Sequence, residues 1–306
     1  MKVFFNRYGE LRSGWSITAV LFTMFLMQFA GVFISVFFTF ILPPDILNSP
    51  YTGGLLQVLV EMLMFASVLL LFWLVYKKSP SFLGLSAKGA LKDFGGGVAV
   101  GAVCISAVAL LTIGLGFCQA EWIGFTPHNI PYIMMNLVVH LSVGLSEETI
   151  ARGYLMTVSK TTRKNWFIIG ISGLLFGLLH LSNPGVTVLS LANIVLIGVA
   201  FALMFVRRGS IWMPVGFHFI WNFMQGSLYG SAVSGTDVVP LIGLTQVGPD
   251  LFTGGEFGFE GNVFTTIITI LCCLFVVYVY PKCKDPRWTL DSDLPLVRVD
   301  KPPVSP

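Results

Sequence analysis

The sequence predicts an all-α membrane protein with about eight transmembrane helices, and three observations lead to this fold class. Hydrophobic residues make up 55% of the 306 residues and charged residues only 11%, whereas about a quarter of a soluble globular chain is charged. Apolar runs long enough to cross about 30 Å of hydrocarbon recur along the chain. The basic residues fall in every second segment between these runs, as the positive-inside rule requires.

Eight segments have the composition and approximate length of a transmembrane helix, which takes about 20 residues. The first is too long for the core of a signal peptide and lacks a small-residue cleavage site, so we expect it to be retained as a helix. The fifth and seventh are short and could be buried among their neighbours. The eight segments are roughly 14–42, 54–76, 94–117, 132–159, 165–182, 186–206, 210–228 and 262–280.

The positions of the basic residues test this count of helices. With the N-terminus inside, 17 of the 18 Lys and Arg residues lie in inner segments, and the outer loops hold acidic residues but no basic ones. We therefore expect both termini to be cytoplasmic. The basic residue left over is Arg152, which lies within the fourth span.

The remaining composition limits the function classes. No clustered basic face is present, so we expect no nucleic-acid partner. The five cysteines lack the spacing of a metal site and are interpreted as packing residues. In GGGVAVG (95–101), Gly97 and Gly101 favour close helix packing, because no strand precedes them as a dinucleotide-binding loop requires.

We expect the chain to be organised in four parts. The long outer loop among them is interpreted as a lid, an interfacial segment or a plain disordered connector. The four parts are N-terminal helices one to three (1–125), a catalytic core of helices four to seven (126–230), the outer loop (231–261), and the last helix with a cytoplasmic tail (262–306).

Ionisable side chains inside the predicted spans mark a functional site by default, because they are costly in a bilayer. Glu148 and Arg152 are four residues apart and share a helix face, so we expect them to form an ion pair. Glu147 lies about 100° around the helix from Glu148 and has no basic residue four positions away. The spacing therefore predicts a structural Glu148 and a Glu147 that is free to act. The roles of Glu61 and His140 stay open.

Three helices bring further polar side chains to comparable depths. At 1.5 Å per residue, Glu147 and His180 lie about 20 and 22 Å from the inner ends of their helices. His218 and Asn222 lie at about 12 and 18 Å, and as an i,i+4 pair they point the same way. Glu147 with His180 could hold and deprotonate water. The two donors His218 and Asn222 suit an oxyanion, so together these residues predict hydrolysis of an amide bond.

The segments EETIAR, FGLLH and HFIWN, in this order, resemble the three motifs of the CPBP family. These are the CAAX-processing and bacteriocin-processing intramembrane proteases, also called the Abi family and related to the type II CAAX prenyl endopeptidase. The resemblance covers roughly residues 130–226. It implies an eight-helix fold with a CAAX-protease-like core, and cleavage of a membrane-embedded, prenylated or leader peptide. The compact chain and the style of its motifs favour a bacterial plasma membrane over a eukaryotic internal membrane.

The resemblance also implies a role for each motif residue. Glu147 would activate the water with assistance from His180, and His218 with Asn222 would stabilise the oxyanion. The remaining motif positions are matched by Glu148 and Arg152.

Several alternatives remain open at this stage. Glu147, His180 and His218 could be three ligands of a catalytic zinc, with water as the fourth. GISG (170–173) is similar to the GxSG of rhomboid serine proteases, with Ser172 as nucleophile. In that mechanism Glu147 and Glu148 would have no catalytic role. The motif HExxH does not occur in the sequence. A non-proteolytic transporter and a non-catalytic bacteriocin-immunity protein are the other classes.

Overall fold

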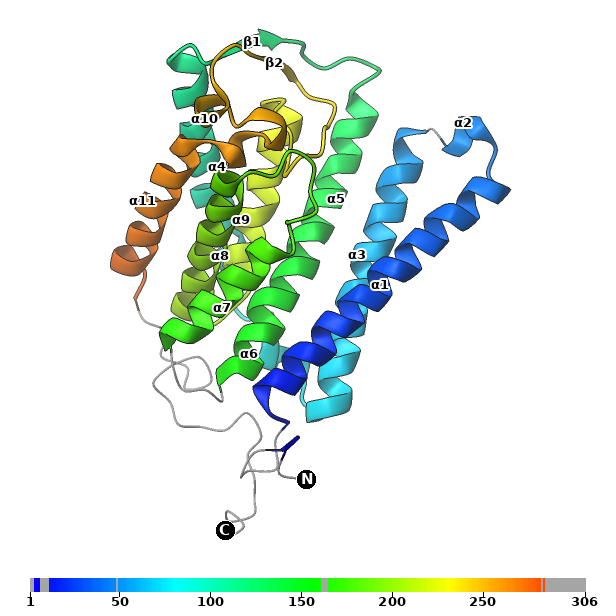
Figure 1. The fold of residues 1–306 in the computed structure, drawn as a ribbon, viewed down its shortest axis with the longest axis vertical. Helices are drawn as coiled ribbons and strands as arrows, with labels where there is room; N and C mark the ends of the chain where they lie inside the picture. The colour runs from blue at the N-terminus through cyan, green and yellow to red at the C-terminus, as the bar shows by residue number, and fades with distance from the viewer. Residues whose placement is uncertain (1–2, 6–10, 48, 161–164, 282, 284–306) are drawn as a thin grey trace.

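The computed structural model describes residues 3–5, 11–47, 49–160, 165–281 and 283, and most of this chain is helical (Figure 1). Eight helical segments of the described chain form the bundle, which confirms the predicted all-α class. Five of them are long and apolar enough to cross a membrane, and the others are shorter. The segments are α1 (Ser13–Ile41), α3 (Pro50–Tyr76), α4 (Ala90–Gly114), α5 (Ile130–Glu148) with its continuation through η2 (Thr149–Leu155) and α6 (Met156–Ser159), α7 (Asn165–Leu178), α8 (Val188–Arg208), α9 (Trp212–Phe223) with η4 (Met224–Leu228), and α11 (Val263–Val279).

A small sheet and several short helices cover one end of the bundle (Figure 1). Strand β1 (Cys118–Trp122) pairs antiparallel with β2 (Ile242–Gln246), which ties the segment after α4 to the long segment after η4. The interpretation of residues 231–261 as a plain disordered connector is therefore wrong. The other short elements are α2 (Pro44–Leu47), η1 (Pro80–Leu83), α10 (Asp250–Thr253), η5 (Gly255–Phe257) and η6 (Phe259–Gly261).

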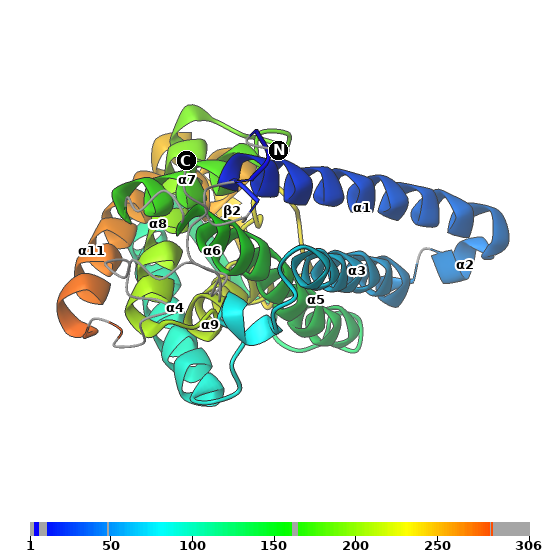
Figure 2. The ribbon, with the colours of Figure 1, turned by 90° about the horizontal axis from the view of Figure 1, so that it is seen from below.

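The helices form a main bundle with a side layer of α1 and α3 (Figures 1 and 2). In the main bundle α4 packs on α9 and α7 packs on α8, around a core that includes Ile105, Phe201 and Phe217. The side layer packs on η2 through a second core, where Phe72 contacts Tyr154 edge-on. One face of α1 is exposed and apolar, as expected of a helix that contacts lipid. Its exposed phenylalanines are Phe22, Phe25, Phe29, Phe33, Phe37 and Phe40.

Charge is segregated between the two ends of the bundle. Every described Lys and Arg except Arg152 lies at or beyond a helix terminus at the end that carries α6, opposite the β1–β2 sheet (Figure 1). The prediction that both termini are cytoplasmic depends on this distribution of basic residues, through the positive-inside rule. The described residues of the basic end are Arg12, Lys77, Lys78, Lys88, Lys92, Lys160, Arg207 and Arg208. The other basic residues of the predicted inner face, Lys2, Arg7, Arg163, Lys164, Lys282, Lys284, Arg287, Arg298 and Lys301, lie outside the described residues.

Glycines allow α4 and α9 to approach closely, which confirms the packing role predicted for Gly97 and Gly101. A Cβ at Gly97 would overlap the carbonyl oxygen of Met213, and one at Gly101 would lie 2.9 Å from the carbonyl oxygen of Phe217. Because α9 carries His218 and Asn222, this contact fixes the height and rotation of one wall of the site described below.

We expect Gly97→Val to lower the thermal stability of the purified protein in detergent. The added side chain meets backbone rather than a flexible side chain, and overpacking of this kind costs about 1–3 kcal/mol. Gly95→Val is the matched control, because a Cβ at Gly95, on the same helix, has nothing within 4 Å. Equal unfolding temperatures for the two variants would contradict the packing role.

Candidate active site

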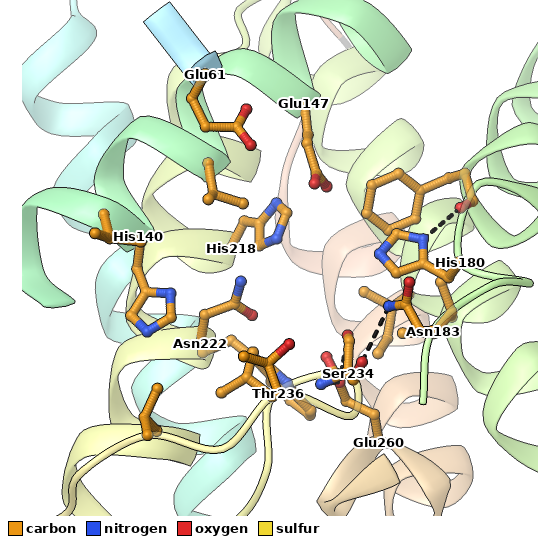
Figure 3. A pocket seen from close by; sticks show the side chains of 18 of the residues that line it. Glu61, His140, Glu147, His180, Asn183, His218, Asn222, Ser234, Thr236 and Glu260 are labelled. Atoms are coloured by element: carbon orange, nitrogen blue, oxygen red, sulfur yellow. Dashed lines mark hydrogen bonds between the residues drawn. The ribbon is translucent and has the colours of Figure 1, made fainter. Parts of the chain in front are cut away.

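A cavity of about 220 Å³ lies within the bundle between α3, α5, α7, α8, α9 and the outer loop (Figure 3). Polar side chains from α3, α5, α9, the turn after α7 and the outer loop line it. Its polar lining residues are Gln57, Glu61, Asn136, His140, Glu147, His180, Asn183, His218, Asn222, Ser234, Thr236 and Glu260. The structure therefore brings together Glu147, His180, His218 and Asn222, which the sequence places on three separate helices.

The two adjacent glutamates have different environments. Glu147 lies at the cavity and is partly accessible, whereas Glu148 is fully buried behind the cavity wall. The predicted ion pair is present, because Arg152 Nη1 donates to Glu148 Oε1 over 2.8 Å. Oε2 of Glu147 is itself buried and accepts no hydrogen bond from the described residues. Glu147 is thus the carboxylate of the pair that faces the cavity without an ion-pair partner.

Arg152 is held on several sides. Its guanidinium lies 4.4 Å from the ring centre of Phe176 and 5.0 Å from that of Phe201. Its Nη2 also donates to the carbonyl oxygen of Gly198, over 2.9 Å. Buried charges persist when they are paired, hydrogen-bonded and in contact with aromatic faces. Arg152 is therefore well placed to hold Glu148 in one orientation, since all of these contacts fix its own position.

Glu148 also contacts the site itself, which its spacing to Arg152 did not predict. Nδ1 of His218 lies 3.2 Å from the same Oε1 that accepts the Arg152 hydrogen bond. A carboxylate accepts hydrogen bonds, so Nδ1 of His218 is the donor. Phe201 stacks on the imidazole at 5.4 Å between ring centres. The contacts from Glu148 and Phe201 fix the plane of the His218 ring relative to the cavity.

His180 lies just beyond the end of α7, two residues after Leu178, rather than within a span that continues to residue 182. Its Nδ1 lies 2.8 Å from the carbonyl oxygen of Phe176 (Figure 3). Because a carbonyl only accepts, Nδ1 carries the proton, and Nε2 of the neutral ring is an acceptor. This is the form in which an imidazole can hold a water molecule by one of its hydrogens.

His218 and Asn222 lie one turn apart on the cavity face of α9 (Figure 3). Both are largely buried, with 7% and 6% of their surface exposed. His218 interacts electrostatically with Glu147 as well as with Glu148. The arrangement places a carboxylate, an imidazole and an amide around one small cavity.

Each of the two stretches that carry these side chains is followed directly by a π-helical segment. Thr149–Leu155 begins after Glu148, and Met224–Leu228 begins two residues after Asn222. Such segments shift the hydrogen-bond pattern from i→i+4 to i→i+5 and are common at functional sites. Helical spacing in the sequence could not predict this change of hydrogen-bond pattern. It alters the direction in which the later side chains point, relative to the side chains that face the cavity.

The outer loop supplies part of the cavity wall, which the sequence did not reveal. Glu260 Oε2 accepts hydrogen bonds from the amide and hydroxyl of Ser234, at 2.8 and 2.7 Å. The Ser234 carbonyl in turn accepts from Asn183 Nδ2, three residues beyond His180, over 3.0 Å (Figure 3). Asn193 on α8 donates to the backbone carbonyl of Glu260 over 2.8 Å. These contacts join the loop to α8 and to the turn that carries His180.

The environment of the Glu260 carboxyl is consistent with this anchoring role. Burial raises its pKa, while the hydrogen bonds from Ser234 act in the opposite direction. The sequence offered one signal, an acidic residue in a loop otherwise rich in glycine and apolar residues. That signal did not distinguish it from exposed Glu256, which is in the same loop.

We expect Glu260→Ala to speed hydrogen exchange of residues 231–236 roughly tenfold or more. The substitution leaves the two Ser234 donors unpaired, which costs about 1–3 kcal/mol and raises the population of the open loop. Exchange followed by mass spectrometry in detergent measures this, with Glu256→Ala as the matched control. Exchange at the wild-type rate in both variants would show that the Glu260 anchor is unimportant.

Two residues whose roles the sequence left open also line the cavity. His140 lies on α5 and is buried, and its Nε2 has no hydrogen-bond partner among the described residues. Glu61 reaches the cavity from α3, on the same side as Glu147 (Figure 3). Neither is therefore a packing residue remote from the site.

The alternative protease chemistries can be compared with this geometry. Ser172 is fully buried and donates to the carbonyl oxygen of Ala151 over 3.0 Å, and it does not line the cavity, so the rhomboid-like interpretation is wrong. Within the described residues, no three His, Cys, Asp or Glu side chains converge closely enough to hold a metal ion. The donor set as arranged does not fit a zinc centre, and no step below is assigned to a metal.

The fold and the cavity define a polytopic helical membrane protein with a cluster of carboxyl and imidazole side chains buried among its helices. Residues 129–224 match the model of the family described as type II CAAX prenyl endopeptidase Rce1-like. This match confirms the resemblance of the segment to the CAAX-protease-like family, a family of membrane endopeptidases, and it spans Glu147, His180, His218 and Asn222. No curated protein and no solved structure matches the chain.

Proposed function

We propose that the protein is an intramembrane endopeptidase that hydrolyses a peptide bond by a water molecule activated at Glu147. The observation that carries this proposal is the division between the two glutamates. Glu148 is bound to Arg152 and His218, whereas Glu147 faces a cavity that also holds His180 and Asn222. A base, a water-holding imidazole and two further donors are the groups that activate the water and stabilise the oxyanion in amide hydrolysis.

The mechanism follows from the hydrogen-bonding capacity of each side chain. Nε2 of His180 accepts one hydrogen of the water, and Glu147 removes the other proton as the oxygen attacks the carbonyl carbon. The carbonyl oxygen becomes an oxyanion, which receives hydrogen bonds from the Asn222 amide and from Nε2 of a doubly protonated His218. Glu148 favours this form of His218, because its negatively charged carboxylate accepts a hydrogen bond from Nδ1–H.

The position of the cavity bears on the substrate. The outer loop forms part of its wall, at the end of the bundle opposite the basic residues. With both termini in the cytoplasm of a bacterial plasma membrane, the site would lie toward the outer half of the bilayer. A membrane-embedded or lipid-anchored peptide that reaches this half, such as a leader peptide, then suits the site better than a peptide confined to the inner surface.

Comparison of the peptides in membranes from a wild-type strain and a Glu147→Gln strain tests the proposed function. We expect one or a few peptides to be released only by the wild type, with the uncut precursor accumulating in the variant. Identical peptide profiles together with loss of a solute flux would indicate a transporter instead. Retention of the cellular phenotype in Glu147→Gln, His180→Ala and His218→Ala would indicate a non-catalytic protein such as an immunity protein.

Removal of metal ions should leave peptide cleavage by the purified protein within about twofold of its starting rate, since general acid–base groups alone supply the chemistry here. The measurement is the cleavage rate after exhaustive chelation and after addition of zinc. Loss of activity upon chelation and its return with zinc would favour the alternative in which Glu147, His180 and His218 bind the ion.

A further inference from the structure

Amide hydrolysis requires a proton at the leaving nitrogen as well as a base for the water. An amine anion is too poor a leaving group to depart without that proton, so a second acid–base group beside the base accelerates bond cleavage. Glu147, His180, His218 and Asn222 account for the water and the oxyanion. The cavity contains one further carboxyl on the same side as Glu147, that of Glu61 (Figure 3).

Glu61 projects from α3 toward the space that Glu147 enters from α5 (Figure 3). The two carboxyl groups are close enough to interact electrostatically. Oε2 of Glu61 is buried and has no hydrogen-bond partner among the described residues, as is also true of Oε2 of Glu147, although the Glu61 carboxyl also interacts with the side chain of Ser146 on α5. Buried polar atoms are normally hydrogen-bonded, so the Oε2 atoms of Glu61 and Glu147 that face the cavity are available to a bound molecule.

Two carboxylates that face one water-poor space repel each other, and such pairs hold one proton between them. One member of the pair is then a base and the other an acid at the same time. Glu61 and Glu147 differ in the groups around them. Glu147 lies beside His180 and His218 and is thus the member placed to receive the proton of the water.

Glu61 also lines a second cavity beside the first. The second cavity, of about 620 Å³, opens toward α1, and both cavities are lined by Glu61, Glu147 and His180. Its far wall is formed by the α1 side chains Leu21, Met24, Phe25 and Gln28. A chain that passes from one cavity to the other would have its cleaved bond at the junction, next to both carboxyls.

We propose that Glu61 is a second catalytic carboxyl of this site and donates a proton to the leaving nitrogen, with the leaving half of the substrate in the cavity toward α1. The inference rests on the proposed endopeptidase function and adds a residue from outside the segment 129–224 that matches the family model.

The step balances without a further reactant. Water adds its oxygen to the carbonyl carbon, and its proton passes to Glu147. The carbon–nitrogen bond then breaks as the Glu61 carboxyl gives its proton to the nitrogen, which leaves as an amine. The proton on Glu147 returns to Glu61, so the pair again holds one proton and the net reaction consumes one water per bond.

A pair of matched substrates separates this role from a structural one. The first is the peptide identified by the comparison of membranes, and the second is its depsipeptide, in which the cleaved N–H is replaced by oxygen. An alkoxide leaves far more readily than an amine anion and depends less on an acid. We expect Glu61→Gln to slow cleavage of the peptide about a hundredfold and cleavage of the depsipeptide less than about threefold. Glu147→Gln should slow both, because both reactions need the activated water.

Two further variants complete the test. Glu61→Asp, which keeps the acid, should recover part of the peptide cleavage lost in Glu61→Gln, and Glu121→Gln, at an exposed acid on β1, should leave both rates unchanged. Equal slowing of both substrates by Glu61→Gln, or no slowing of either, would overturn the role of Glu61 while the endopeptidase stands. If no peptide is released in the comparison of membranes, the proposed function fails, and this inference fails with it.

Discussion

Replacement of Glu147 by glutamine is expected to lower the rate of peptide cleavage about a hundred- to ten-thousandfold and to leave the fold intact. Glutamine has nearly the same shape but cannot take a proton from water at neutral pH. Glu147 forms no ion pair within the described residues, and its Oε2 bonds to none of them. The substitution therefore removes a base without removing a structural contact. Initial rates on the purified protein measure the loss, and unfolding temperature in detergent checks the fold.

Glu148→Gln is the matched comparison, because it makes the same chemical change one residue away. Glu148 accepts hydrogen bonds from both Arg152 and His218, so its neutralisation leaves the buried Arg152 cation without its counter-charge. We expect Glu148→Gln to lower the unfolding temperature clearly, in addition to any loss of rate. The division of roles would be wrong if Glu147→Gln unfolded more readily than Glu148→Gln, or if it cleaved at the wild-type rate.

Arg152→Met is expected to cost about 3–5 kcal/mol of stability, the range found when one partner of a buried ion pair is removed. Methionine fills much of the volume between Phe176 and Phe201, so the loss would come mainly from the buried Glu148 carboxylate, which keeps only its contact with His218, rather than from a cavity. The free energy of unfolding in a detergent–denaturant mixture measures the change. The double variant Glu148→Gln with Arg152→Met should recover part of the loss, because it leaves no uncompensated charge. A single Arg152→Met protein as stable as the wild type would show that the ion pair is dispensable.

The helices could be predicted from the sequence because a bilayer imposes strict length and charge rules. Apolar runs and the positions of Lys and Arg located all eight helical segments to within a few residues at most boundaries. The largest departures were at the start of α3 and α4, whose first turns are less apolar than their centres, and at the end of α7. The orientation of the bundle in the membrane remains a prediction.

Part of the candidate site could also be predicted, because charged and polar side chains are rare in apolar helices. Helical spacing separated Glu147 from Glu148, and matched depth grouped His180 with His218. Contacts between segments that are distant in the sequence could not be predicted. The bond between Glu148 and His218 joins residues 70 positions apart, and that between Glu260 and Ser234 lies in a loop without periodicity. Neither helical period nor residue type carries information on such pairs. Glu61 could not be assigned to the site for the same reason, since its position depends on how α3 packs against α5.

The most direct test of water activation at Glu147 is cleavage of the identified peptide in ¹⁸O-labelled water by purified protein in lipid vesicles. The wild-type protein should release a product whose new carboxyl group contains oxygen from the labelled water, and Glu147→Gln of equal stability should release almost none. Labelled product formed by Glu147→Gln at the wild-type rate would contradict the role assigned to this glutamate, and absence of any cleavage by the wild type would contradict the endopeptidase function.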